Sequence, residues 1–90
     1  MENPDTNVDL IALAQQFARD ILSGKLTPYQ GGRKIWWECK LNLTGDDHRL
    51  DPFVYWASEY EETSSTKRQA LCNKALRYAA ELLIQSGSAL

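Results

Sequence analysis

One histidine and two cysteines are the residues of this chain best suited to nucleophilic catalysis or to binding a transition metal. A metal site needs three or four converging ligands, normally in paired spacings such as HxxxH or CxxC, and neither spacing occurs. Cys39 and Cys72 fall on apolar helix faces, where burial raises the pKa of a thiol and makes it inert. We therefore predict buried, reduced cysteines, a solvated loop residue at His48, and neither metal nor cofactor.

Carboxylates are the other candidate catalytic groups. A general acid–base pair could be drawn from four of them, Asp51, Glu59, Glu61 and Glu62. Glu59 and Glu62 are one helical turn apart, on the side away from Phe53 and Trp56, and this arrangement is more typical of a solvated helix face. We predict no catalytic residues. A small enzyme, or a small-molecule-binding protein built on this acidic and aromatic segment, is the alternative.

Charge is distributed unevenly along the 90 residues, although the net charge is only −2. From Asp46 to Glu62 there are six acids and one base, a net charge of −5, whereas Lys67 to Arg77 holds four bases and no acid. Either neighbouring helices neutralise each other, which contributes little per exposed pair, or one charged face is free to attract a partner. The overall balance disfavours a nucleic-acid-binding protein and a polybasic membrane protein.

Four helices are predicted from local start signals followed by helical apolar spacing. The start signals are Thr6 with Asp9, Thr27-Pro28 with Gln30, Asp51-Pro52, and Thr66 with Gln69. The predicted ranges are 6–23, 27–43, 51–62 and 66–85, with Gly24 and Gly87 as stops. The expected fold is an all-α, single-domain bundle of four helices, the third short, over residues 6–86, with frayed ends at 1–5 and 87–90.

Apolar periodicity also predicts which side chains form the core. The expected buried residues are Phe17, Ile21, Trp36, Cys39, Phe53, Trp56, Leu71, Ala75 and Leu82. Gly32 lies on the apolar face of its helix, which favours close packing of a neighbouring helix. The chain shows no basic, apolar leader and no apolar run of about 18 residues, so we expect a cytoplasmic protein that does not enter a membrane.

Aromatic residues that fall off the apolar faces suggest two surfaces for contact with another protein. The first is Tyr55 with Glu59 and Glu62, whose spacing of four and three residues places an aromatic ring beside two carboxylates on one line of the third helix. The second consists of Arg33, Trp37 and Leu41. The corresponding alternatives are an ordinary solvated face for the first surface and a helix–helix contact for Trp37.

Two segments, LSGKLTPYQGGRKIW and LDPFVYWASEYEE, resemble a group of short bacterial helical proteins. In that group a Pro-Tyr-x-Gly helix start and a Trp precede a Pro-Phe-Val helix that ends in acidic residues. The resemblance covers 22–62 and implies a bacterial, cytoplasmic origin, with no activity, cofactor or site residue attached. We predict a non-catalytic protein-interaction module that binds a protein partner or itself, and an immunity- or antitoxin-like inhibitor is one subtype.

Overall fold

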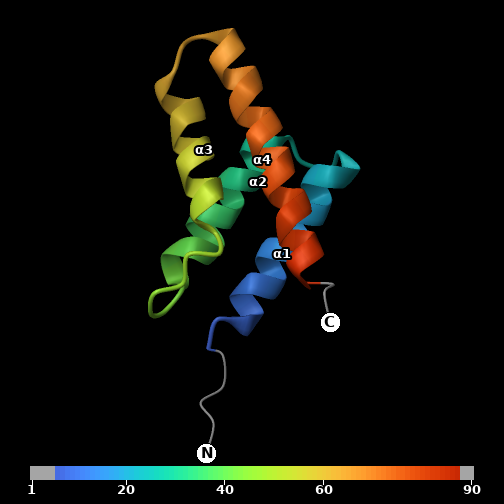
Figure 1. Cartoon of the computed structure of the whole chain (residues 1–90), viewed down its shortest axis with the longest axis vertical. Coiled ribbons are helices and arrows are strands. Elements are labelled where there is room, and N and C mark those ends of the chain that lie inside the picture. The colour runs from blue at the N-terminus through green and yellow to red at the C-terminus, as the bar shows by residue number, and fades with distance from the viewer. Residues whose placement is uncertain (1–5, 88–90) are drawn as a thin grey trace, which may run out of the picture.

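The computed structural model describes residues 6–87 and contains, in that range, four α-helices and no strand. These are α1 (Val8–Ser23), α2 (Pro28–Lys34), α3 (Asp51–Glu62) and α4 (Thr66–Gly87), as Figure 1 shows. A π-helical turn, η1 (Ile35–Cys39), and a 3₁₀ turn, η2 (Lys40–Asn42), continue α2. The all-α bundle predicted from the sequence is confirmed. The fraying predicted for 1–5 and 87–90 lies outside the described residues except at Gly87, which belongs to α4, so its prediction was wrong.

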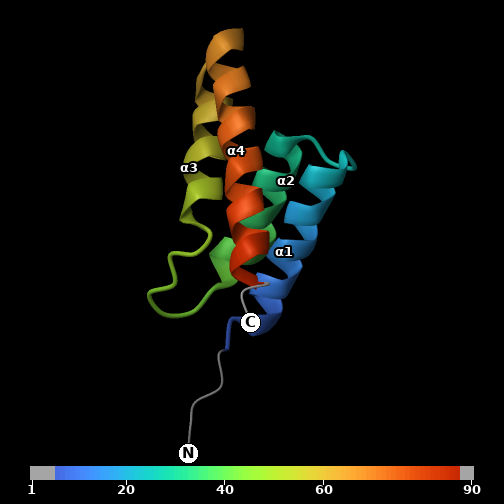
Figure 2. The ribbon, with the colours of Figure 1, turned by 45° about the vertical axis from the view of Figure 1, so that its right-hand side comes forward.

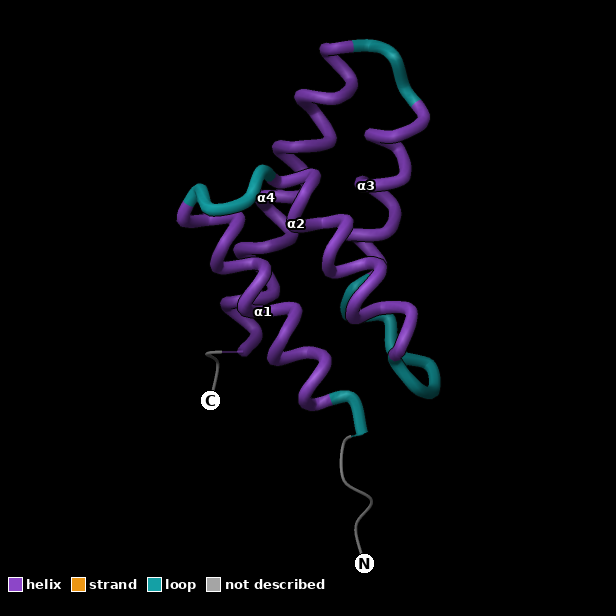
Figure 3. Tube along the Cα trace, turned by 180° about the vertical axis from the view of Figure 1, so that it is seen from behind, coloured by secondary structure: helices purple, strands orange, loops and turns teal. Residues whose placement is uncertain are grey.

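Helix α4 is the centre of the bundle and packs against α1, α2 and α3. Helices α3 and α4 form an antiparallel hairpin, and Figures 1 and 2 show its turn projecting beyond the connection between α1 and α2. Seen from behind in Figure 3, that turn lies at the end of the molecule opposite the start of α1 and the end of α4. One part of the hairpin is therefore enclosed by α1 and α2, while another part stands clear of them.

The helix start and stop predicted from local sequence signals agree with the structure most closely around α2. The side chain of Thr27 accepts a hydrogen bond from the backbone N–H of Gln30 at 3.1 Å, and Gln30 Oε1 accepts one from the Thr27 N–H at 3.0 Å. This is the predicted capping box. Gly24 ends α1 in the left-handed conformation, with φ of 86°, as its position predicted.

Three predicted N-caps are wrong by one residue. The N-cap of α3 is Leu50, whose side chain makes no capping hydrogen bond, and Asp51 is instead the first residue of the helix. The N-cap of α1 is Asn7 rather than Thr6, because the Asn7 side chain fastens this end of the helix to the loop 44–49. At α4, the hydroxyl oxygen of Ser65 accepts a hydrogen bond from the Arg68 N–H at 3.2 Å, so Ser65 takes the capping role predicted for Thr66. Gln69 instead donates from its side chain to the Thr63 carbonyl.

Two consecutive glycines allow α2 to lie between two neighbouring helices. A Cβ atom built on Gly31 would stand 2.2 Å from Ile21 Cγ1 on α1, and one built on Gly32 would stand 2.7 Å from Leu76 Cδ2 on α4. Both distances are far below a van der Waals contact. The packing role predicted for Gly32 is therefore confirmed, and Gly31 plays the same part toward α1.

The core differs from the predicted one mainly in α4. Ile21, Cys39 and Phe53 are buried as predicted, whereas Leu71 and Leu82 are each 46% exposed, so their prediction was wrong. Four other predicted core residues are half-buried, namely Phe17, Trp36, Trp56 and Ala75. The buried face of α4 is instead formed by Cys72, Leu76, Ala79, Ala80 and Leu83. This face contains more small residues, so α1, α2 and α3 can approach α4 closely on that side.

Candidate functional site

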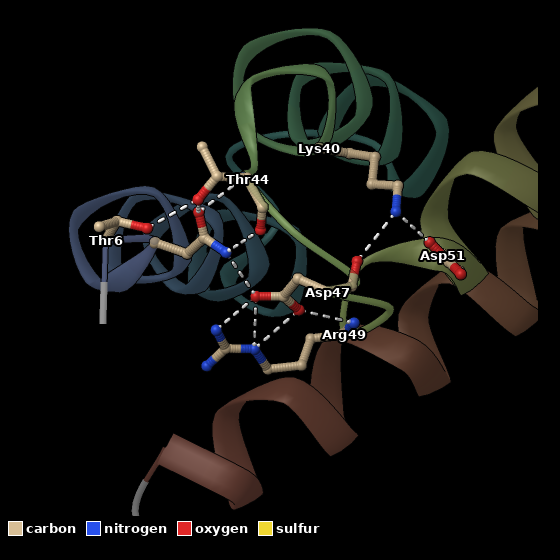
Figure 4. Close-up of polar contacts among 7 residues, drawn as sticks. Thr6, Lys40, Thr44, Asp47, Arg49 and Asp51 are labelled. Carbon is tan, nitrogen blue, oxygen red and sulfur yellow. Dashed lines mark hydrogen bonds and ion pairs between the residues drawn. The ribbon is translucent and has the colours of Figure 1, made fainter. Parts of the chain in front are cut away.

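The polar residues of the loop 44–49 form a dense network that fastens the start of α1 (Figure 4). Asn7 is 6% exposed, and its amide donates hydrogen bonds to the Thr44 carbonyl at 2.9 Å and to Asp47 Oδ2 at 3.0 Å. Its Oδ1 accepts from the Thr44 N–H at 2.9 Å, and Arg49 Nε donates to Asp47 Oδ1 at 3.0 Å. The hydrogen bonds from Arg49 hold the pKa of Asp47 well below its ordinary value. Every polar group of this network bonds within the chain, so its role is structural.

His48 lies at the edge of this network and is solvated, as predicted. Its side chain is 75% exposed, and Nδ1 lies 2.7 Å from Asp51 Oδ2. The ammonium group of Lys40 lies 2.6 Å from Asp51 Oδ1, and this contact lowers the pKa of the Asp51 carboxyl. Within 6–87 the structure contains no group of three His, Cys, Asp or Glu side chains that could hold a metal ion.

The carboxylates proposed for acid–base chemistry do not converge. Asp51 pairs with Lys40, and Glu59 pairs with Arg68 on α4. Glu61 lies 3.6 Å from Arg33 and accepts a hydrogen bond from a tyrosine. These three carboxylates therefore have separate partners in different places, and the four candidates form no shared site for a substrate.

Both thiols are buried and free, as predicted. Burial raises the pKa of Cys39 to about 11, and the neighbouring Glu38 carboxylate adds to this effect. Burial also raises the pKa of Cys72. Neither thiol is a nucleophile at neutral pH, because the reactive form is the thiolate and both are kept as thiols.

The first predicted surface lies on one side of α3, but only part of it is free. Tyr55 is 54% exposed and Glu62 is exposed, so these two side chains can be reached by a partner. Glu59 instead forms an ion pair with Arg68, whose guanidinium also lies 5.9 Å from the centre of the Trp56 ring. The structure thus joins Glu59 to α4, so the three residues do not form a separate acidic face.

Two residues of the second predicted surface, Arg33 and Trp37, line a shallow groove along α2 and η1, whereas Leu41 on η2 lies outside it. Trp37 is 52% exposed and Leu41 is 56% exposed, and the Arg33 guanidinium lies 6.0 Å from the centre of the Trp37 ring. The groove is about 380 Å³ and is bounded on one side by Tyr29. Tyr29 stacks on Tyr60 of α3 with ring centres 4.3 Å apart, so this groove has a rigid wall.

A third surface, between α3 and α4, was not predicted as a site. Leu71, Ala75, Tyr78 and Leu82 follow one another at spacings of four, three and four on α4, and we call them the α4 stripe. Tyr78 is 61% exposed, while Leu71 and Leu82 are each 46% exposed. Beside the stripe runs a groove of about 410 Å³, which we call the hairpin groove, lined chiefly by Pro52, Phe53, Trp56, Ala75, Tyr78 and Leu82.

The sequence contained a signal for this surface. Apolar periodicity assigns three members of the stripe, Leu71, Ala75 and Leu82, to the core, because a regular apolar stripe on a helix usually is core. Only the packed structure shows that a second face of the same helix, centred on Leu76, takes the core position. The α4 stripe is therefore an apolar face without a covering element among residues 6–87.

The chain has no match among protein-family models, and searches of curated proteins and of solved structures also return no match. The resemblance to the group of short bacterial proteins therefore stays a prediction. Among the described residues, no helix combines the length and the apolar character needed to span a lipid bilayer.

Proposed function

We propose that this chain is a non-catalytic protein-interaction module that binds its partner through the α4 stripe and the hairpin groove. The observation that carries the proposal is the exposure of three large apolar side chains, Leu71, Tyr78 and Leu82, in one line on α4. Contiguous exposed apolar surface of this kind marks interaction sites in folded proteins. The arrangement suits a partner that presents apolar side chains on a helix.

Aromatic side chains near the stripe strengthen this proposal. Tyr78 stands at the stripe, the Trp56 ring lines the hairpin groove, and Tyr55 contacts Trp56 edge-on with ring centres 4.8 Å apart. Tyrosine and tryptophan are enriched among the residues that contribute most to protein–protein affinity. The Tyr55 and Trp56 rings contact each other, so they lose little side-chain entropy when a partner binds.

The immunity- or antitoxin-like subtype requires an acidic face that covers a basic site on a toxin. Three of the four carboxylates on α3 are already paired, Asp51 with Lys40, Glu59 with Arg68 and Glu61 with Arg33. We therefore base the proposal on apolar contact and keep the inhibitor subtype as one form that such a module can take.

Site-specific photo-crosslinking in the native cell tests the proposal. Tyr78 is replaced with p-benzoylphenylalanine, and Leu13, which is 39% exposed on α1, carries the same group as the matched control. We expect a protein adduct from position 78 and none from position 13. Absence of an adduct at position 78 contradicts the proposal. A third probe replaces Trp37, and an adduct from this probe alone would show that the partner binds the second predicted surface instead.

Binding of a small apolar molecule in the hairpin groove is a second candidate function. The observation that favours it is the volume of about 410 Å³, which is within the range of ligand pockets. Titration with a fluorescent apolar dye distinguishes the two functions. If the groove is a small-molecule site, each chain binds one dye molecule. Ala75→Trp fills the groove and should abolish this binding, while the helical circular dichroism signal stays unchanged.

A further inference from the structure

We infer that the partner of the α4 stripe is a second copy of this chain, and that two hairpins pack groove to groove as an antiparallel four-helix bundle. This inference rests on the proposed function, because it names the partner of the same surface. Helix α4 has its buried face against α1 and α2, and α3 packs along one side of it. The α4 stripe points to the remaining open side, where another helical hairpin would complete a bundle of four.

The sizes of the side chains favour an antiparallel copy. Spacings of four, three and four are those of the apolar seam between two packed helices. When the stripe is paired with itself in the opposite direction, Leu71 meets Leu82 of the other copy and Ala75 meets Tyr78. The smallest residue of the stripe is thus placed against the largest, and this happens twice because of the two-fold symmetry. A parallel pairing would instead place Tyr78 against Tyr78 and leave Ala75 against Ala75.

The charges beside the stripe fit the same arrangement. Lys74 and Glu81 lie on the solvent side of α4, each directly before a stripe residue in the sequence, and both are exposed. In the antiparallel register defined above, Lys74 of one copy approaches Glu81 of the other, again twice. Opposite charges at such flanking positions select the orientation and the partner of packed helices.

The groove side of the interface contains no charge that would oppose the packing. Arg49 at one end of the groove is bonded to Asp47, and Arg68 is bonded to Glu59. The other lining residues are apolar apart from Ser86 and the hydroxyl group of Tyr78. The apolar rings of Pro52 and Trp56 are therefore available to contact the second hairpin, and the two grooves are filled by the stripes that face them.

Sedimentation equilibrium of the purified full chain tests the inference. We expect twice the mass of one chain at high concentration, with reversible dissociation on dilution. Leu82→Glu should raise the dimer dissociation constant at least about tenfold, because it buries a carboxylate in an apolar interface. The matched control is Leu41→Glu, at a leucine that is 56% exposed on η2, and it should leave the constant unchanged. Circular dichroism verifies that both variants are folded.

A charge exchange tests the register. Lys74→Glu and Glu81→Lys each place like charges together and should weaken the dimer several-fold, while the double variant should restore it. A chain that is monomeric at all concentrations overturns the inference, and so does a dimer unaffected by Leu82→Glu. In the photo-crosslinking experiment, an adduct at 78 with twice the chain mass supports the inference, whereas an adduct of another mass overturns it and leaves the proposed function standing. The absence of any adduct overturns the proposed function itself.

Discussion

The two apolar faces of α4 differ in what lies against them. On one face, Leu76 is fully buried and approaches the backbone of Gly32 so closely that a methyl group would not fit. On the other face, Tyr78 is 61% exposed, although it belongs to a stripe as regular as that of the core. The comparison teaches that apolar content alone does not decide which face of α4 becomes core, because the buried face is the one that has small residues of its own and meets Gly32 on the neighbouring helix.

The largest effect that tests this comparison is expected from Phe53 on α3. Phe53 is 1% exposed, and Phe53→Ala should lower the free energy of unfolding by about 3–5 kcal/mol, because it leaves a cavity in the core. Tyr55→Ala, two residues away on the same helix, should cost only about 0.5 kcal/mol. Urea unfolding followed by circular dichroism measures both. Equal losses for the two variants would contradict the division between an enclosed and an open side of the hairpin.

The close approach at Gly31 should give the next largest effect. Gly31→Val forces a side chain against Ile21, which is 1% exposed and has no room to retreat, so we expect a loss of about 3 kcal/mol in unfolding free energy. Ala70→Val, at an exposed position of α4, is the control and should cost less than about 1 kcal/mol. Adding Ile21→Ala to Gly31→Val should recover part of the loss. A valine tolerated at 31 would show that α1 and α2 are not in tight contact.

Protonation of Asp47 should destabilise the bundle where the loop 44–49 is bonded to the start of α1. Its pKa is lowered by Arg49, so its contribution to stability is complete above its ordinary pKa of about 4 and is lost as the pH falls toward the lowered value. Asp47→Asn should lower the free energy of unfolding by about 2 kcal/mol at pH 7. Between about pH 5 and 2, the unfolding free energy of this variant should fall less than that of the original chain. The control is Asp46→Asn, at the exposed neighbouring residue. Identical acid unfolding curves for Asp47→Asn and the original chain would contradict this role.

The smallest effect is expected at the ion pair near the projecting turn of the hairpin. The side chains of Glu59 and Arg68 are 28% and 40% exposed, so solvent screens their attraction. Glu59→Gln should lower the free energy of unfolding by about 0.5 kcal/mol, and added salt should reduce this difference. Thermal melting at two salt concentrations measures it. A loss of 2 kcal/mol or more would show that this end of the hairpin is as tightly organised as the core.

The fold was predictable where one local signal determines the backbone. Thr27, Pro28 and Gln30 satisfy the backbone groups at the start of α2, and Gly24 supplies a left-handed residue at the end of α1, so neither feature depends on distant residues. The range of α3, 51–62, also matches the prediction and begins beside Pro52, although Leu50 and not the predicted Asp51 is its N-cap. Where a cap depends on another part of the chain, as at Asn7, the prediction was wrong by one residue.

The candidate site was less predictable, because it depends on which face of a helix is covered. Leu71 and Leu76 are equally apolar, and no local pattern distinguishes the exposed residue from the buried one. The π-helical turn at 35–39 was missed for a related reason, since the expected periodicity assumes a regular helix. Tyr55 and Trp37 were correctly placed at the surface, because each lies off the apolar face of its own helix.

The position of α4 at the end of the described sequence has a consequence for how the protein is made. Helix α1 buries Ala14 and Ala18 in a core completed by α4, yet more than sixty residues separate Val8 from the centre of α4. At roughly 5–20 residues per second, a ribosome needs several seconds to synthesise that interval. During this time the apolar face of α1 has no α4 to cover it. A nascent chain halted before α4 should therefore be a substrate for chaperones that bind exposed apolar helices.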